Sequence, residues 1–275
     1  MVTIAQVSTL HESGVRPLNE DTVLVDTEAG VFGVFDGASS LDSYLSPDQK
    51  TGAYIASHKA ADVFSQPHDN LIEALADADK QINNIQVDVG IDTSDSVNRF
   101  STTVAVIRVS NNQAELLQVG DSLIIVVYKD GHAEASLGYH DHDLEVMRKW
   151  RKLADGGKTN IRQIVADDVV QLRRSGNITY GTLNGDSASN KFIQTTTIDL
   201  DDVASILIIT DGMFIPKEDP DGEDDWNYYA QLYKEGGLKR IYSIVRELEK
   251  SDPELIKYPR YKLHDDASGV AVDFA

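Results

Sequence analysis

The sequence predicts an α+β fold whose strands pair antiparallel. Short apolar runs rich in β-branched residues are bounded by polar or glycine-containing turns, which is typical of strands. Strands and helices come in blocks, in the order strands, two helices, strands, a less regular stretch, strands, a helix and a last strand. A regular alternation of strand and helix would indicate a parallel sheet instead.

Short links connect several of the expected strands. Asn111 and Asn112 form one link, and Gly120 and Asp121 form another. Links this short favour antiparallel neighbours, because a parallel crossover needs about a dozen residues or more. We therefore expect the strands that flank each link to pair. The expected strands lie at 22–25, 31–35, 102–109, 114–119, 123–128, 206–209 and 267–274.

Apolar residues at helical spacing predict helices at 47–64, 71–82 and 238–248, and a weaker one with charged faces at 140–153. Pro47 opens the first helix and Asn70 is placed to cap the second. The region from about 138 to 190 is the least regular, and we expect it to form a flap inserted beside the core. The length suits one large domain, so we expect a single domain over 1–275.

The composition indicates a globular protein without thiol chemistry. Apolar residues make up 41% of the 275 residues, enough for a sizeable core, and cysteine is absent. Disulfides, zinc–thiolate sites and a cysteine nucleophile are therefore excluded. We find neither a signal-peptide pattern nor an apolar stretch of roughly 18 residues, and we expect a soluble cytoplasmic protein.

The formal net charge of −20 disfavours nucleic acid and anionic membranes as partners, because both carry negative charge. The same field would repel a phosphorylated substrate. An acidic enzyme that binds phosphate needs local positive charge, and metal cations supply it most simply. The alternative explanation of the charge is a solvated acidic surface.

Acidic residues stand at the edges of several apolar strands. Any one of them is readily explained as a turn residue, because aspartate is common in turns and rare in strands. If the strands share a core, however, their ends can converge, and converging carboxylates cannot all stay ionised without a cation. The residues are Asp36, Asp121 and Asp211 after strands, and the pairs Glu20–Asp21 and Asp265–Asp266 before strands.

These carboxylates favour a metal-dependent phosphomonoester hydrolase. Oxygen ligands select hard ions such as Mg²⁺ or Mn²⁺. Two such ions about 4 Å apart can activate a water and hold a phosphoryl oxygen. Gly37 and Gly212, directly after two of the aspartates, leave room for the backbone to approach an ion or its waters.

Six short motifs resemble those of the metal-dependent 2C-type serine/threonine protein phosphatases, of the bacterial type. Each motif is weak alone, but they follow the family's order over nearly the whole chain. The first is Arg16 four residues before Glu20-Asp21. The others lie at 34–37, 101–103, 119–122, 209–212 and 265–268.

The resemblance implies a four-layer α-β-β-α sandwich of two antiparallel sheets flanked by helices, with the metals at one end. It implies two Mn²⁺ or Mg²⁺ ions, and a third in many members. Asp36 would bridge two ions, and Asp211 and Asp265 would complete the first site. Glu20, through water, and the carbonyl of Gly37 would serve the second site. The motif alignment favours Asp265 over its neighbour Asp266 as the ligand.

The resemblance also implies the reaction and the partners. Asp121 together with Asp211 would form the weaker third site, and Arg16 would bind the substrate phosphate with its planar donor fork. Arg16, Asp36 and Asp211 are thus the expected catalytic residues. A metal-bridging hydroxide would attack phosphorus in phosphoserine or phosphothreonine of a phosphoprotein, without a phosphoenzyme. The partner kinase is expected on a separate chain.

Two motifs depart from the family's pattern. Ala38, Ser39 and Ser40 replace the usual continuation to Gly-Gly, and Ala38 stands where some members carry a histidine proposed as general acid. Leu123 replaces the arginine that commonly follows Ser122. These departures leave open a catalytically weak or inactive phosphatase-like signalling or binding module. An unrelated metal hydrolase, such as a nuclease, is disfavoured by the charge of −20.

Three other segments attract attention. The cluster 140–143, with alternating His and Asp, is expected to be a solvated loop or helix start, because alternate residues diverge on a helix. The acidic stretch 219–225 lacks the terminal glutamate of a calcium loop and is expected to be a plain loop. The stretch 180–186 is either a structural turn or a loop over the site.

Overall fold

The computed structural model describes residues 2–38 and 44–275 and contains two five-stranded sheets. All strand pairs within them are antiparallel. In order, the first sheet consists of β1 (Ile4–Glu12), β12 (Ala267–Phe274), β11 (Val203–Ile209), β8 (Leu123–Tyr128) and β9 (Ala133–Ala135). The second consists of β10 (Gln194–Asp199), β7 (Gln113–Val119), β6 (Val104–Ser110), β3 (Val31–Phe35) and β2 (Thr22–Asp26).

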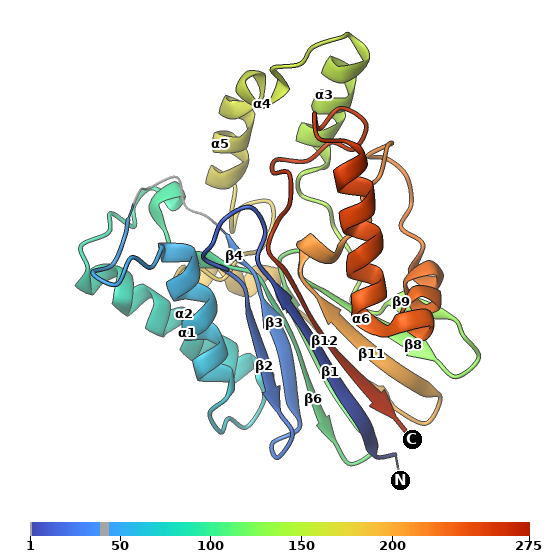
Figure 1. The fold of residues 1–275 in the computed structure, drawn as a ribbon. Coiled ribbons are helices and arrows are strands. Elements are labelled where there is room, and N and C mark those ends of the chain that lie inside the picture. The colour runs from blue at the N-terminus through green and yellow to red at the C-terminus, as the bar shows by residue number, and fades with distance from the viewer. Residues whose placement is uncertain (1, 39–43) are drawn as a thin grey trace.

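The two sheets pack face to face, and helices cover their outer faces (Figure 1). Helices α1 (Gly52–Phe64) and α2 (Leu71–Asp88) cover the second sheet, and α6 (Trp226–Ser251) covers the first. Apolar side chains from both sheets form the layer between them, and many, such as Phe32 and Ile124, are fully buried. Burying one such side chain contributes about 1.5–3 kcal/mol. The predicted four-layer sandwich is confirmed.

The helices on the outer faces differ from the prediction mainly at their ends. α1 begins at Gly52 rather than at Pro47, because the Thr51 side chain caps it by accepting a hydrogen bond from Tyr54 N. The cap at Asn70 is confirmed, and its Oδ1 accepts from Glu73 N at 2.9 Å. The third predicted helix is the second half of α6, which is longer and kinks at two adjacent glycines, 236 and 237.

One inferred strand pairing is wrong. The short link at Gly120 does not join hydrogen-bonded neighbours, because β7 lies in the second sheet and β8 in the first. Gly120 has φ +90, and a side chain there would collide with Thr103. The left-handed backbone turns the chain from one sheet into the other within three residues. The Asn111–Asn112 link does form a hairpin, between β6 and β7.

Strands β1, β9 and β10 were not predicted. β10 alternates half-buried and exposed residues and contains three threonines in succession, so it lacks the apolar run that marked the other strands. β1 is a mostly polar edge strand of the first sheet. The predicted strand 102–109 is divided into β5 (Ser101–Thr102) and β6, because β5 pairs with β4 (Gly37–Ala38) in a separate two-stranded sheet.

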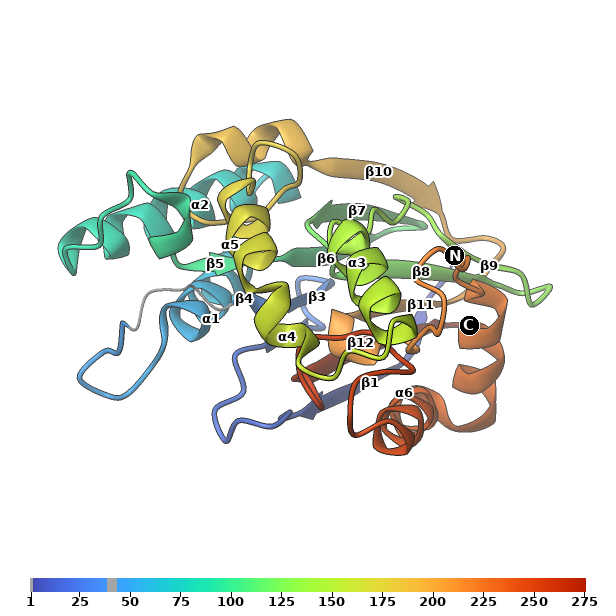
Figure 2. The same ribbon diagram turned by 90° about the horizontal axis from the view of Figure 1, so that it is seen from above.

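Three helices project from one end of the sandwich, opposite the two termini (Figures 1 and 2). They are α3 (Leu144–Asp155), α4 (Ile161–Ile164) and α5 (Ala166–Arg174), and we call residues 144–174 the flap. The flap has its own apolar cluster around Val146, Trp150, Ile161 and Val165. No helix in the described part of the chain combines the length and apolar character needed to cross a membrane.

Candidate active site

Four of the predicted aspartates line one cavity of about 410 Å³ at the end of the sandwich that the flap covers. Asp36 follows β3, Asp121 follows β7, Asp211 follows β11 and Asp265 lies just before β12. These strands belong to both sheets, so the packing of the sheets brings their ends together. The convergence expected from the strand ends is thus present in the fold.

The carboxyl groups at the cavity floor raise one another's pKa. Burial, followed by the charges of Asp211 and Asp21, raises the pKa of Asp36 well above its usual value. Burial, with the charges of Asp265 and Asp121, raises the pKa of Asp211 to about 7, and a hydrogen bond with Asp36 opposes this shift. Groups of this kind are stabilised in their ionised form by a nearby cation.

The donor set fits a hard divalent cation. All the groups are oxygens, and Oδ1 of Asp211 is buried without a hydrogen-bond partner. Within residues 2–38 and 44–275, however, no three acidic or histidine side chains already have the spacing of an assembled ligand set. The carboxylates therefore share the cavity without closing on a common point.

The structure separates the roles of the two adjacent aspartates before β12. Asp265 lines the cavity. Asp266 is buried and points away from it: Oδ1 accepts a hydrogen bond from Gly14 N and Oδ2 from Glu20 N, both at 2.7 Å. Asp266 thus fastens the loop before β2 that carries Arg16 and Glu20.

Asp21 belongs to the acidic group although it was not chosen from the sequence. It is 1% exposed, and its Oδ2 accepts a hydrogen bond from the Thr210 hydroxyl at 2.9 Å. Burial, then the charges of Asp211 and Asp265, raises its pKa well above the usual value. The sequence did mark Asp21 as part of the acidic pair Glu20–Asp21, but the resemblance to the family assigned the metal ligand to Glu20.

Arg16 and Glu20 lie together at the edge of the site. Arg16 lines the cavity, and its Nη1 lies 3.5 Å from Oε2 of Glu20. Glu20 is buried and does not line the cavity, and its Oε1 accepts a hydrogen bond from the Thr51 hydroxyl at 2.6 Å. Gly37 and Ala38 also line the cavity, whereas Ser39 and Ser40 lie outside the described residues.

The segments on either side of the flap, 140–143 and 180–186, contribute side chains to the cavity. The prediction that 140–143 is solvated is wrong for its second half, because His142 and Asp143 both line the cavity. The His142 ring stacks on Tyr180 with centroids 4.1 Å apart, and its Nε2 lies 3.7 Å from Oδ2 of Asp121. Tyr180 lines the same cavity, so the 180–186 stretch does reach the site.

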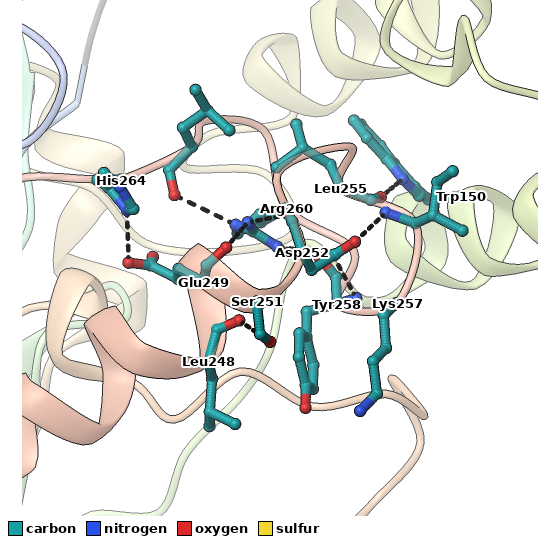
Figure 3. Close-up of polar contacts among 12 residues, drawn as sticks. Trp150, Leu248, Glu249, Ser251, Asp252, Leu255, Lys257, Tyr258, Arg260 and His264 are labelled. Atoms are coloured by element: carbon teal, nitrogen blue, oxygen red, sulfur yellow. Dashed lines mark hydrogen bonds and ion pairs between the residues drawn. The ribbon is translucent and has the colours of Figure 1, made fainter.

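A braced segment between α6 and β12 carries further cavity residues (Figure 3). Asp252 accepts hydrogen bonds from the backbone N of Tyr258 and from Nη1 of Arg260, at 2.9 and 3.0 Å. Trp150 of α3 donates to the Leu255 carbonyl at 2.7 Å and so ties the flap to this segment. Two cavity residues, Tyr261 and Lys262, follow directly.

The upper part of the cavity is basic and apolar, in contrast to its acidic floor. Residues from α4, α5 and the segment 96–99 form this part. No hydrogen bond to the Arg173 guanidinium occurs within the described residues, so this half-buried group faces the cavity without a fixed acceptor. The cations are Arg99, Arg162 and Arg173, and the apolar residues are Val97, Val165, Ala166, Val169 and Val170.

Comparisons with known proteins agree with this architecture. The family described as protein phosphatase 2C matches residues 15–240. PppA, a key regulatory component of T6SS in Pseudomonas aeruginosa, has a TM-score of 0.60 at 17% identity, covering 100% of this chain and 99% of that one. No curated protein sequence matches.

Two structures of the serine/threonine phosphatase PstP are also similar. The structure from Mycobacterium tuberculosis has a TM-score of 0.59 at 18% identity, covering 98% of this chain and 99% of that one. A PstP catalytic domain in complex with two manganese ions has a TM-score of 0.55 at 16% identity, covering 100% of both chains. These similarities establish the fold. Since the family match also spans most of the sequence, the chain belongs to the protein phosphatase 2C family of serine/threonine phosphatases.

Proposed function

We propose that this protein is an active phosphatase that hydrolyses phosphoserine or phosphothreonine in proteins and requires Mn²⁺ or Mg²⁺. The observation that carries the proposal is the juxtaposition of Asp36 and Asp211. The charge of Asp211 raises the pKa of Asp36, burial with the charges of Asp265 and Asp121 raises that of Asp211, and one oxygen of Asp211 is buried without a partner. A divalent cation is the species that such a pair would bind.

The proposed ligands are those that the family resemblance implies, and their support is that Asp36, Asp211 and Asp265 line one cavity. Asp36 would bridge two ions, with Asp211 and Asp265 on the first. The Gly37 carbonyl, and Glu20 through water, would serve the second. The manganese-bound PstP domain of the same fold supports this number of ions.

A third ion would lie at the flap side of the cluster. Asp121 lines the cavity with Asp211, and its charge raises the pKa of Asp211; its Oδ2 lies 3.7 Å from Nε2 of His142, in the segment that leads into the flap. Asp121 and Asp211 would hold this ion. His142 would lie close enough to this ion to interact with its charge.

The bound ions would supply an activated water as nucleophile and would neutralise charge on the phosphoryl oxygens. The chain's own residues would bind and orient the substrate. Arg16, with Nη1 3.5 Å from Glu20, is held at the cavity edge and would donate to the phosphate. The local cations overcome the repulsion expected from a net charge of −20.

The form of the cavity supports a peptide substrate. The acidic floor suits the ions and the phosphate, while the apolar side chains of α5, such as Val169 and Val170, suit the flanking peptide. Residues 138–190, which include the flap, would form an insert within a single domain, with α4 and α5 setting substrate choice. The partners would be a phosphoprotein and a kinase on a separate chain, and a cytoplasmic location stays a prediction of the sequence.

A catalytically weak signalling module is the second candidate. It is favoured by the absence of an assembled ligand set among the described residues and by Ala38 in the place of a possible proton donor. Phosphate release separates the two candidates. Purified protein would be assayed with an aryl phosphate and a phosphothreonine peptide, in Mn²⁺ and in chelator.

If the enzyme is active, it releases phosphate only with Mn²⁺. The Asp36→Asn and Asp211→Asn variants should then lose at least about a hundredfold in rate, because mutating even a residue that only hydrogen-bonds to a metal ligand lowers activity about 10–100-fold. Asp62→Asn is the matched control, because Asp62 is a 72%-exposed surface carboxylate. Phosphate release that persists in chelator, or none under any condition, contradicts the proposal.

A further inference from the structure

A lysine lies inside the acidic group. Nζ of Lys262 is 2.6 Å from Oδ1 of Asp265, and the two side chains are 31% and 32% exposed. Burial lowers the pKa of Lys262, but the charges of Asp265, Asp211 and Asp36 outweigh this and raise it overall. A lysine is ordinarily charged at neutral pH, so its ammonium group lies in direct contact with one proposed metal ligand.

The backbone on both sides of Lys262 is fixed. Tyr261 donates a hydrogen bond from its hydroxyl to Oδ1 of Asp143 at 3.0 Å, and Asp252 with Arg260 braces the preceding turns. Arg246 donates to the carbonyl oxygen of Asp265. Because these contacts hold the chain, the ion pair can open only by rotation of the two side chains.

The ion pair also engages one oxygen of a proposed metal ligand. Oδ1 of Asp265 accepts from Lys262 Nζ and from Asp266 N, at 2.6 and 2.9 Å, so this oxygen is already engaged. Asp211, by contrast, keeps one oxygen without a partner. A cation that takes Asp265 as a ligand must compete with an ammonium group already in contact with it.

We propose that Lys262 is an internal counter-cation of the candidate metal centre. It holds Asp265 when no ion is bound, and the first divalent ion displaces it, so Lys262 lowers the affinity for metal. The inference rests on the proposed function in one respect, that Asp265 is a metal ligand. It predicts that removing the ammonium group strengthens metal binding.

The test is calorimetric titration of the metal-free protein with Mn²⁺, without substrate. The Lys262→Met variant should bind the first ion about tenfold more tightly than the wild type, equivalent to about 1.4 kcal/mol. Lys257→Met is the matched control: it removes the same charge five residues away, where Lys257 pairs with Glu218 on the surface at 3.0 Å. It should change the affinity by less than about twofold, because exposed charges are screened by solvent and salt.

An unchanged or weaker affinity for Mn²⁺ in Lys262→Met overturns the proposal, as does equal tightening in Lys257→Met. Lys262→Gln provides a second uncharged variant if the methionine variant does not fold. Lys262→Arg keeps the charge and can pair with Asp265 through two donors, so it should bind Mn²⁺ no more tightly than the wild type.

The Asp265→Asn variant separates failure of this inference from failure of the proposed function. If Asp265 is a ligand, Asp265→Asn weakens Mn²⁺ binding, and adding Lys262→Met to it should give no further gain. If Asp265→Asn leaves Mn²⁺ affinity unchanged, the proposed ligand set is wrong. If Asp265→Asn weakens binding but Lys262→Met tightens it equally in both backgrounds, Lys262 does not act through Asp265 and the inference fails alone.

Discussion

Gly212 packs directly against the backbone of Asp266, so closely that a Cβ added at Gly212 would overlap the Asp266 carbonyl oxygen. Gly37 is similarly pressed against the carbonyl oxygen of Glu20. Gly212 follows Asp211, and Gly37 follows Asp36. Each glycine therefore brings the motif of its own aspartate into contact with a second acidic motif. The sequence had suggested that these glycines make room for a metal, whereas the structure shows that they first make room for neighbouring backbone.

Gly212→Ala should therefore lower stability and Mn²⁺ affinity together. Overpacking costs about 1–3 kcal/mol, because the backbone of two motifs must separate. Urea denaturation measures the loss, and Gly156→Ala is the control, since a Cβ there meets only ordinary contacts at 3.4 and 3.5 Å. Equal stability of Gly212→Ala and the wild type would show that the contact yields without strain.

The neighbouring aspartates should give opposite effects when replaced. Asp266→Ala leaves the N–H groups of Gly14 and Glu20 without their acceptor, which costs about 1–3 kcal/mol for the buried Glu20 N–H and less for the part-buried Gly14 N–H. Asp265→Asn should change stability by less than about 1 kcal/mol and weaken Mn²⁺ binding. Denaturation and metal titration of both variants test this. If Asp266→Ala leaves the fold intact but abolishes Mn²⁺ binding, the assignment of roles is reversed.

The metal-free protein should become less stable as pH rises from about 4 to 7. The pKa of Asp211 is raised from 3.8 in the unfolded chain to about 7 in the folded protein, so the folded state binds more protons in this range. The resulting stabilisation is complete below pH 3.8 and is lost as pH rises through about 7.

Melting temperatures in chelator across this pH range isolate the contribution of Asp211. The difference between Asp211→Asn and the wild type should shift in favour of the variant as pH rises, while Asp62→Asn should show no such trend. A difference that is independent of pH would mean that the Asp211 carboxyl titrates normally. Added Mn²⁺ should stabilise the wild type more at pH 7 than at pH 5, because the ion binds the deprotonated carboxylates.

Arg173→Ala should raise KM for a phosphopeptide about tenfold with little change in kcat. The guanidinium lines the cavity and makes no hydrogen bond to the described residues, so an oxyanion of the substrate is its expected partner. Arg174→Ala is the matched control, because Arg174 is adjacent in sequence but pairs with Asp95 at 3.2 Å outside the cavity. Steady-state kinetics that show the same KM in Arg173→Ala and Arg174→Ala would exclude this role.

The sequence predicted the parts of the fold that local chemistry determines. Strands with continuous apolar runs, such as β8 and β12, were predicted at their observed bounds because both are buried on two sides. β10 was missed because it lies at a sheet edge, where a strand needs no apolar run, and three of its residues are consecutive threonines. The assignment of β7 and β8 to different sheets depends on one left-handed glycine, Gly120, whose effect a short link does not reveal.

The site was only partly predictable for a similar reason. Asp36, Asp121 and Asp211 could be found because each ends an apolar strand. The cavity residues His142, Arg173 and Lys262 lie in or beside the flap and in the braced segment, which have no strand or motif to mark them. Their approach to the site results from tertiary contacts, such as the hydrogen bond from Trp150 to the Leu255 carbonyl.

The central claim is that Asp36, Asp211 and Asp265 form a metal centre, and anomalous diffraction from crystals grown with Mn²⁺ tests it most directly. We expect two strong manganese peaks in the cavity, one in contact with all three carboxylates and both in contact with Asp36, with Lys262 turned away from Asp265. Manganese peaks only at surface carboxylates, with the Lys262–Asp265 ion pair intact at saturating Mn²⁺, would contradict the account.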